Sequence, residues 1–141
     1  MSTTAIHKLQ AGSLNIEIHP DRNSAGEAAA RDAAHSLVRL GQANDRFGVI
    51  FATGASQLSM LEPLTSTPNL PWSKVLGFHL AEYIGMPVDH PASFRGYLRK
   101  NLLSEVNLGT FYEIDGTAPD IDEVCVSYAR TLRTVSPQLC L

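Results

Sequence analysis

The strongest constraint on the fold is the uninterrupted apolar segment Val49–Phe51, at the centre of a strand predicted over residues 46–53. A strand of this kind is usually buried on both faces, as in a parallel sheet. Other segments alternate around it, with strands predicted over 14–18, 74–80 and 110–114, and helices over 24–40, 58–64, 93–103 and 120–135. Four strand–helix units predict an α/β fold: a parallel sheet with helices on both faces, in a Rossmann-like three-layer arrangement.

Local signals set the expected boundaries of these elements. Ser24 and Asp120 each begin a capping-box pattern, Gly41 is expected to end the first helix, and Pro137 to end the last one. Cys125 falls within the last helical pattern and is expected to be a core thiol. At 141 residues the chain predicts one domain. We expect a polar N-terminal arm, the α/β domain and a short tail, over residues 1–13, 14–135 and 136–141.

Composition excludes several classes of protein. Apolar residues make up 44% and charged residues 18%, within the range of ordinary globular proteins, and the net charge of −3 gives no basic excess for nucleic acid or an anionic membrane. No apolar run approaches the ~20 residues of a membrane helix, and no secretory signal pattern opens the chain. The two cysteines fit no metal or redox spacing, so we expect no metal. A cytoplasmic location is the prediction.

Ligands of parallel α/β sheets bind beyond the carboxyl ends of the strands. The first such stretch is Thr53, Gly54, Ala55 and Ser56, between a buried strand and a helix. Glycine lets the backbone approach a ligand, the helix N-terminus suits a phosphate, and two hydroxyl groups add hydrogen-bond donors. An ordinary tight turn with a serine cap explains the same residues about as well. The stretch is therefore a candidate phosphate-binding loop, here called the 53–56 loop.

The other two stretches cover residues 80–89 and 115–118. His79, Glu82 and Tyr83 lie within five positions at a strand end, where Glu82 is a candidate base or ligand contact. Taken singly, these residues are also explained as a satisfied buried histidine, a solvated glutamate and a rim tyrosine. His90 begins a turn before the next helix, and a capping role there competes with a role in a site.

Taken together, these segments resemble the glucosamine-6-phosphate deaminase (isomerase) family, which belongs with the 6-phosphogluconolactonases. The resemblance rests on residues 51–56, 78–94 and 115–120, and covers about residues 14–132. Residues 82–93 follow the pattern Glu-Tyr-Ile-Gly-x-Pro-x-Asp-His-Pro-x-Ser, which fits the deaminases better than the lactonases. The resemblance implies conversion of glucosamine 6-phosphate to fructose 6-phosphate and ammonia, without metal or organic cofactor. It places phosphate at the 53–56 loop, with His79, Tyr83 and His90 as possible lining residues.

Two departures from this family change the expected activity. Where the family has the aspartate that abstracts the C2 proton, this chain has Ala81, which leaves the adjacent Glu82 as the candidate catalytic carboxylate. The family also continues into a second half with the ring-opening histidine, and we therefore expect a truncated domain with an exposed sheet edge that favours self-association. Four hypotheses remain: a deaminase, a sugar-phosphate-binding paralogue or fragment without turnover, a nonfunctional fragment, and a 6-phosphogluconolactonase-like hydrolase.

Overall fold

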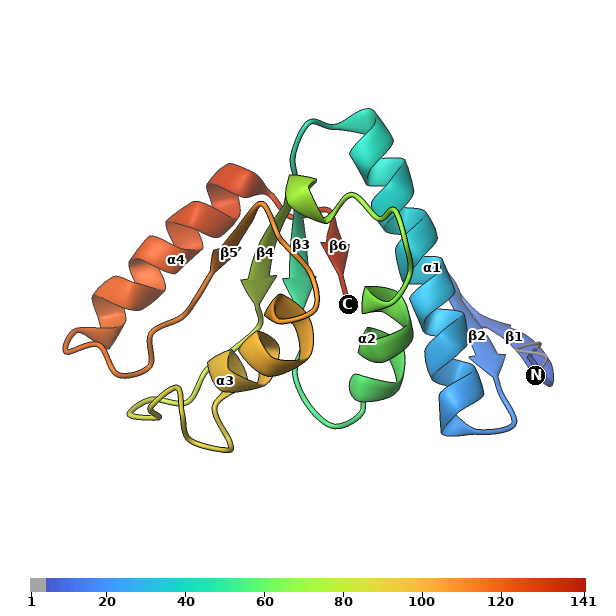
Figure 1. Ribbon diagram of the computed structural model, residues 1–141, viewed down its shortest axis with the longest axis horizontal. Helices are drawn as coiled ribbons and strands as arrows, with labels where there is room; N and C mark the ends of the chain where they lie inside the picture. The colour runs from blue at the N-terminus through green and yellow to red at the C-terminus, as the bar shows by residue number, and fades with distance from the viewer. Residues whose placement is uncertain (1–4) are drawn as a thin grey trace.

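The computed structural model describes residues 5–141 and contains two sheets and four α-helices (Figure 1). The strands are β1 (His7–Ala11), β2 (Leu14–Ile18), β3 (Phe47–Phe51), β4 (Val75–His79), β5 (Thr110–Tyr112) and β6 (Leu139–Cys140). The helices are α1 (Arg22–Ala43), α2 (Leu58–Thr65), α3 (Phe94–Leu98) and α4 (Ile121–Val135). Two short turns, η1 (Trp72–Lys74, 3-10) and η2 (Arg99–Leu103, π-helical), complete the set, and η2 continues α3.

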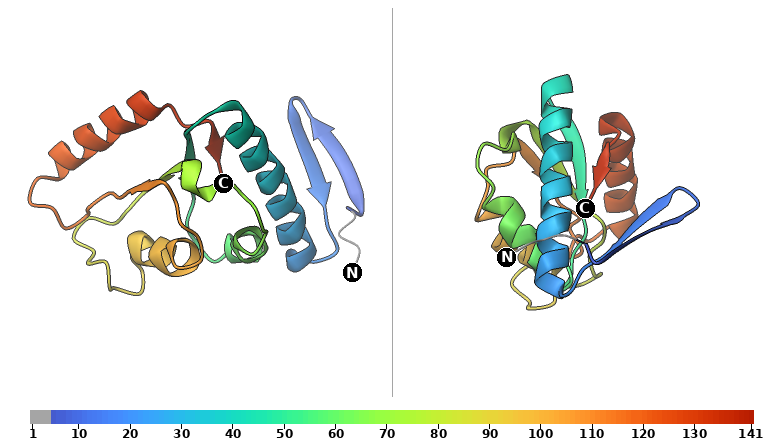
Figure 2. Two further views of the ribbon diagram at one scale, coloured as in Figure 1. Left: turned by 45° about the horizontal axis from the view of Figure 1, so that its top comes forward. Right: turned by 90° about the vertical axis from the view of Figure 1, so that its right-hand side faces the viewer.

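The main sheet has the order β5-β4-β3-β6, and each of its strand pairs is parallel. Residues Phe47 and Phe51 of β3 pair with Val75 and His79 of β4, which aligns the carboxyl ends of the two central strands. Figure 2 shows α4 on one side of this sheet and α2 and α3 on the other. The predicted parallel α/β fold with helices on both faces is confirmed.

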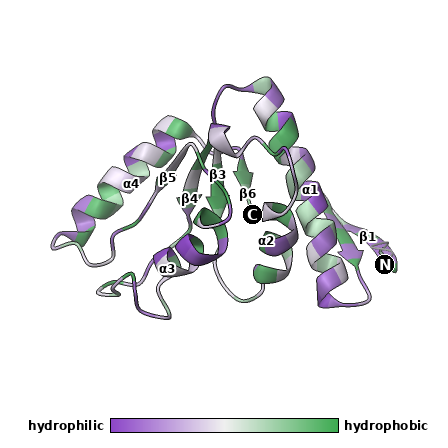
Figure 3. Cartoon of the chain, viewed as in Figure 1, coloured by the Kyte–Doolittle hydropathy of each residue, from purple (hydrophilic) through white to green (hydrophobic). Residues whose placement is uncertain are grey.

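One face of the sheet carries the main core. Alternate side chains of β3 point toward α1, α2 and η2, where small residues of α1 allow close packing; Figure 3 shows the apolar character of the central strands. The most deeply buried members of this core are Leu37, Phe47, Val49, Phe51, Leu61, Leu64, Val75, Leu98 and Leu102. The opposite face is covered by α4, none of whose residues is fully buried. Cys125 on α4 is exposed, so its prediction as a core thiol is wrong.

A separate β-hairpin precedes α1. The strand predicted over residues 14–18 forms as β2, but it pairs antiparallel with β1 and is no part of the parallel sheet. The turn is made at Gly12, whose φ of +60° favours glycine. The polar arm predicted over residues 1–13 thus includes the strand β1, and residues 1–4 lie outside the described residues. Figure 2 shows the hairpin standing beside α1, away from the main sheet.

The ends of the predicted helices differ in detail. Asp21, not Ser24, caps α1: its Oδ1 accepts a hydrogen bond from the Ser24 N–H at 2.8 Å. Gly41 does not end the helix but lies buried within it, where a Cβ atom would stand 2.7 Å from Cγ of Pro71. Asp120 caps α4 as predicted, through the Glu123 N–H at 2.9 Å.

The last six residues are not a free tail. β6 pairs with β3 through Val49↔Leu139 and Ile50↔Cys140, and the Ala52 N–H donates to the Leu141 carbonyl at 2.7 Å. The short tail predicted over residues 136–141 thus contains a strand that extends the main sheet. Because β6 covers this side of β3, the expected exposed edge moves outward from β3 to β6.

Candidate functional site

The loops after β3, β4 and β5 meet at the carboxyl edge of the sheet. The Tyr97 hydroxyl, from the helix after the β4 loop, donates to the Gly54 carbonyl of the β3 loop at 2.9 Å. The Gly85 N–H of the β4 loop donates to the Gly116 carbonyl of the β5 loop at 2.7 Å. The three stretches predicted to bind ligand beyond the carboxyl ends of the strands therefore form one connected region.

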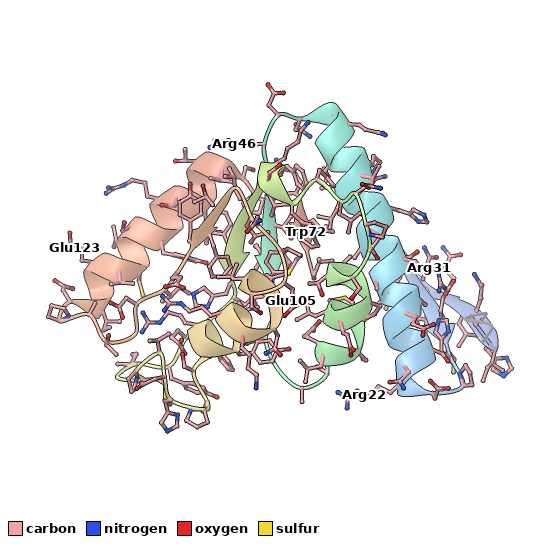
Figure 4. All side chains as sticks on the ribbon, in the orientation of Figure 1. Arg22, Arg31, Arg46, Trp72, Glu105 and Glu123 are labelled. Carbon is pink, nitrogen blue, oxygen red and sulfur yellow. The ribbon has the colours of Figure 1, made fainter. Side chains whose placement is uncertain are left out.

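The 53–56 loop forms a turn ahead of α2. Gly54 has a φ of +134°, which L side chains rarely adopt, and its carbonyl accepts the Gln57 N–H at 3.0 Å. The Arg22 guanidinium, at the start of α1, donates to the Ala55 carbonyl; Figure 4 shows Arg22 directed toward this loop. Of the first-turn N–H groups of α2, that of Met60 donates to the Gln57 carbonyl at 3.0 Å, while those of Leu58 and Ser59 have no hydrogen-bond partner among the described residues. The N-cap residue Gln57 supplies no side-chain cap. Positive charge and free donors therefore coincide at this loop, and the alternative of a serine cap is wrong.

Glu82 lies at the centre of the second loop with its side chain completely buried. One carboxylate oxygen accepts from the N–H groups of Tyr83 (2.9 Å) and Phe94 (3.1 Å). The other accepts from the Ser93 hydroxyl (2.9 Å) and the Arg95 N–H (2.8 Å). The carboxylate thus caps the first turn of α3, together with Ser93, whose hydroxyl accepts from Gly96 N–H at 3.1 Å.

Opposing effects act on the pKa of Glu82. Desolvation by burial raises it, but the hydrogen bonds from Arg95, Tyr83, Phe94 and Ser93 together outweigh burial and leave the pKa below its ordinary value. Glu82 is therefore ionised, enclosed and fully engaged. The prediction that it acts as a catalytic base is not supported by this geometry, because a base needs a free oxygen within reach of the substrate proton.

Two arginines tie α3 and η2 to the end of β5. Arg95, 7% exposed, contacts Asp115 Oδ1 through Nη1 at 3.0 Å and lies 3.6 Å from Glu82 Oε2 through Nε. One helical turn later, Arg99 binds Glu113 in a two-point arrangement, at 2.7 and 2.6 Å. These pairs hold the helix that carries Tyr97 against the β5 loop.

His79 is a core residue at the end of β4. It is 1% exposed, its Nε2 accepts the Ile114 N–H at 2.7 Å, and its Nδ1 has no hydrogen-bond partner within the described part of the chain. Desolvation lowers the pKa of His79 below its ordinary value, so the ring is neutral. The alternative of a buried structural histidine describes it better than a lining residue in contact with solvent.

Tyr83 and His90 are both exposed at the surface of the β4 loop. Tyr83 packs on Phe94 with ring centroids 4.9 Å apart, and His90 Nδ1 accepts the Ala92 N–H at 3.1 Å. His90 also borders a cavity of about 520 Å³ lined in addition by Leu58, Val88, Asp89, Pro91, Gly96, Tyr97, Lys100 and Asn101. The cavity adjoins the 53–56 loop through Leu58 and Tyr97. Of the predicted lining residues, His90 therefore remains a candidate.

Sequence reasoning missed three residues that shape this region: Arg22, Arg95 and Tyr97. The helical spacing of Tyr97 with Phe94 and Leu98 indicates an apolar face, but a tyrosine on such a face also brings a hydroxyl that needs a partner. Residues 5–141 contain no cluster of three or more His, Cys, Asp or Glu side chains arranged to hold a metal ion. None of the helices in that range combines the length and apolar character needed to cross a membrane.

Comparison with known proteins identifies the family. Residues 20–140 match the family described as glucosamine-6-phosphate isomerases/6-phosphogluconolactonase. Glucosamine-6-phosphate deaminase of Streptomyces avermitilis is 34% identical over 124 residues, which are 84% of this chain and 46% of that protein. The corresponding protein of Streptomyces coelicolor is 32% identical over 124 residues, with the same coverage. The chain thus spans about half the length of the curated relatives it matches.

Solved structures agree on the fold. A monomeric glucosamine-6-phosphate deaminase superposes with a TM-score of 0.74 at 20% identity, over 84% of this chain and 49% of that one. The 6-phosphogluconolactonase of Thermotoga maritima superposes with a TM-score of 0.69 at 22% identity, over 81% of this chain and 52% of that one. The match of residues 20–140 identifies the family, and the parallel sheet agrees with it. The chain belongs to the glucosamine-6-phosphate isomerase/6-phosphogluconolactonase family.

Proposed function

We propose that this chain binds an amino-sugar phosphate of the glucosamine 6-phosphate type at the 53–56 loop and does not deaminate it. The observation that carries the proposal is the shape of the loop, in which Gly54 holds a φ of +134° beside the uncapped start of α2 and the Arg22 guanidinium. A helix N-terminus with free N–H groups is an anion-binding arrangement. Membership in the family makes a sugar phosphate the natural anion.

Two features argue against turnover by this chain. Ala81, at the position of the aspartate expected from the family resemblance, has no group that accepts a proton. The neighbouring Glu82 is enclosed by four hydrogen-bond donors, so it does not replace the missing carboxylate. Loss of a positioned general base costs about 10²–10⁴ in rate.

The deaminase relatives and the 82–93 pattern favour an amino-sugar phosphate over a phosphogluconolactone. A lactonase-like hydrolase remains the alternative enzyme, and it differs in its product: it would release 6-phosphogluconate and no ammonia. Assays with glucosamine 6-phosphate and with 6-phosphogluconolactone therefore distinguish the two enzyme activities.

The proposal is tested by calorimetric titration with glucosamine 6-phosphate and with unphosphorylated glucosamine, alongside an ammonia-release assay. We expect binding of the phosphorylated sugar, none of glucosamine, and no ammonia. Gly54→Ala should weaken binding by tenfold or more, or about 1.4 kcal/mol, because a Cβ atom strains the loop. The matched control is Gly12→Ala, a strained substitution in the hairpin with equally open surroundings.

Absence of binding at millimolar sugar phosphate would contradict the proposal, as would equal loss of binding in both glycine variants. Ammonia release by the unaltered chain would contradict its second part. Hydrolysis of 6-phosphogluconolactone would show that the chain is a lactonase-like hydrolase instead.

A further inference from the structure

A chain of hydrogen bonds links the buried carboxylate of Glu82 to the 53–56 loop, although the two follow different strands. The link begins at the first turn of α3. The carboxylate accepts the N–H groups of Phe94 and Arg95 and the hydroxyl of Ser93, which fixes the start of the helix. Arg95 extends this anchor to Asp115 in the β5 loop.

Tyr97 lies in the same short helix, directly after this anchored turn. Its hydroxyl donates to the Gly54 carbonyl at 2.9 Å, a group that also accepts the Gln57 N–H at 3.0 Å. Burial raises the pKa of Tyr97 above its ordinary value, outweighing the opposite effect of the hydrogen bond to Gly54, so the hydroxyl stays protonated and donates. Two donors thus hold the carbonyl of Gly54, the loop residue with a positive φ.

We propose that Tyr97 is a positioning residue for the sugar-phosphate loop, and that Glu82 sets Tyr97 in place by anchoring α3. This inference rests on the proposed function for its ligand. In this arrangement Glu82 serves the site without touching the sugar: it orders the helix, the helix positions the tyrosine, and the tyrosine holds the Gly54 carbonyl and with it the turn ahead of α2. Because the donors are fixed before the anion arrives, binding requires less ordering of the loop.

The test uses Tyr97→Phe, which removes one oxygen atom and keeps the ring. The matched control is Tyr112→Phe, which removes a hydroxyl from a residue of β5 whose ring stacks on Phe78. We expect Tyr97→Phe to weaken glucosamine 6-phosphate binding by about three- to tenfold, the range that one neutral hydrogen bond supplies. Tyr112→Phe should bind as the unaltered chain does.

A second readout follows the loop without ligand. Amide hydrogen exchange of Gln57 should become faster in Tyr97→Phe and in Glu82→Gln, and stay unchanged in Tyr112→Phe. Unchanged binding together with unchanged Gln57 exchange in Tyr97→Phe overturns the inference. If the unaltered chain binds no sugar phosphate, the proposed function falls, and the exchange comparison still decides whether Tyr97 holds the loop.

Discussion

At the scale of single residues, Glu82 lies at a strand end where a catalytic base was predicted, but its carboxylate caps the first turn of α3. Its pKa lies below the ordinary value of 4.5, so folding favours the ionised form. The ionised carboxylate therefore stabilises the fold above pH 4.5. This contribution to the free energy of unfolding disappears as the pH falls below 4.5 through the lower pKa of the folded state. We expect the melting temperature of the unaltered chain to fall in that acidic range.

The variant Glu82→Gln separates this group from the other carboxylates. At pH 7 it should lower the free energy of unfolding by about 1–3 kcal/mol, because an amide nitrogen replaces one acceptor in front of buried donors. The difference between Glu82→Gln and the unaltered chain should shrink as the pH falls below 4.5. Glu62→Gln, at an exposed position, is the control. A constant difference across the pH range in thermal melts would show that Glu82 is not the titrating group.

At the scale of elements, the packing of α1 on α2 depends on small side chains. A Cβ atom at Gly26 would stand 2.7 Å from Cβ of Ser59 and even closer to its backbone carbonyl, so the two helices touch there without a side chain between them. Gly26→Ala raises helix propensity by about 1 kcal/mol yet forces the helices apart. We expect a net loss of stability in chemical denaturation.

The control for this prediction is Ala29→Gly, at an exposed position of α1. It measures the propensity term alone, with an expected cost of about 1 kcal/mol. If Gly26→Ala were stabilising by a similar amount, the close approach of α1 and α2 would be refuted.

At the scale of the whole molecule, β6 is one of the two outer strands of the main sheet, and it is short. β6 contributes two residue pairs, and Cys140 on it is exposed. Exposed strand edges favour pairing with another chain, so self-association through this edge stays our prediction. Sedimentation velocity under reducing conditions should show a concentration-dependent shift to larger species.

A charge at the edge should reduce this association. We expect Cys140→Lys to move the equilibrium toward monomer, while Cys125→Lys, at an exposed position on α4, leaves it unchanged. A monomer at all concentrations, or equal behaviour of the two variants, would count against association through β6.

Much of this architecture was predictable because its signals are local. The apolar run around Val49 identified the central strand, and Asp120 identified the start of α4. Because ligands of parallel sheets bind beyond the carboxyl ends of the strands, three loops were predicted to form a site, and the structure brings them together. The local signals were insufficient where partners are distant: alternation over residues 14–18 predicts a strand but does not say that β1 is its neighbour.

The role of Glu82 was hidden for the same reason. Its donors Ser93, Phe94 and Arg95 lie eleven to thirteen positions along the chain, so only the fold brings them around one carboxylate. β6 was missed because residues 138–141 are too few to show a periodicity. The N-cap of α1 was misplaced by three positions, since Asp21 and Ser24 both carry a capping side chain.

Binding of a sugar phosphate at the 53–56 loop is tested by following backbone amide signals by NMR while glucosamine 6-phosphate is added, with glucosamine and inorganic phosphate as parallel titrations. We expect saturable shifts centred on residues 53–59, larger for the sugar phosphate than for phosphate, and no release of ammonia. Shifts confined to another region, such as the cavity between β5 and α4 that is lined by Glu113, Asp120, Glu123 and Tyr128, would contradict this proposal. So would the absence of shifts at millimolar ligand.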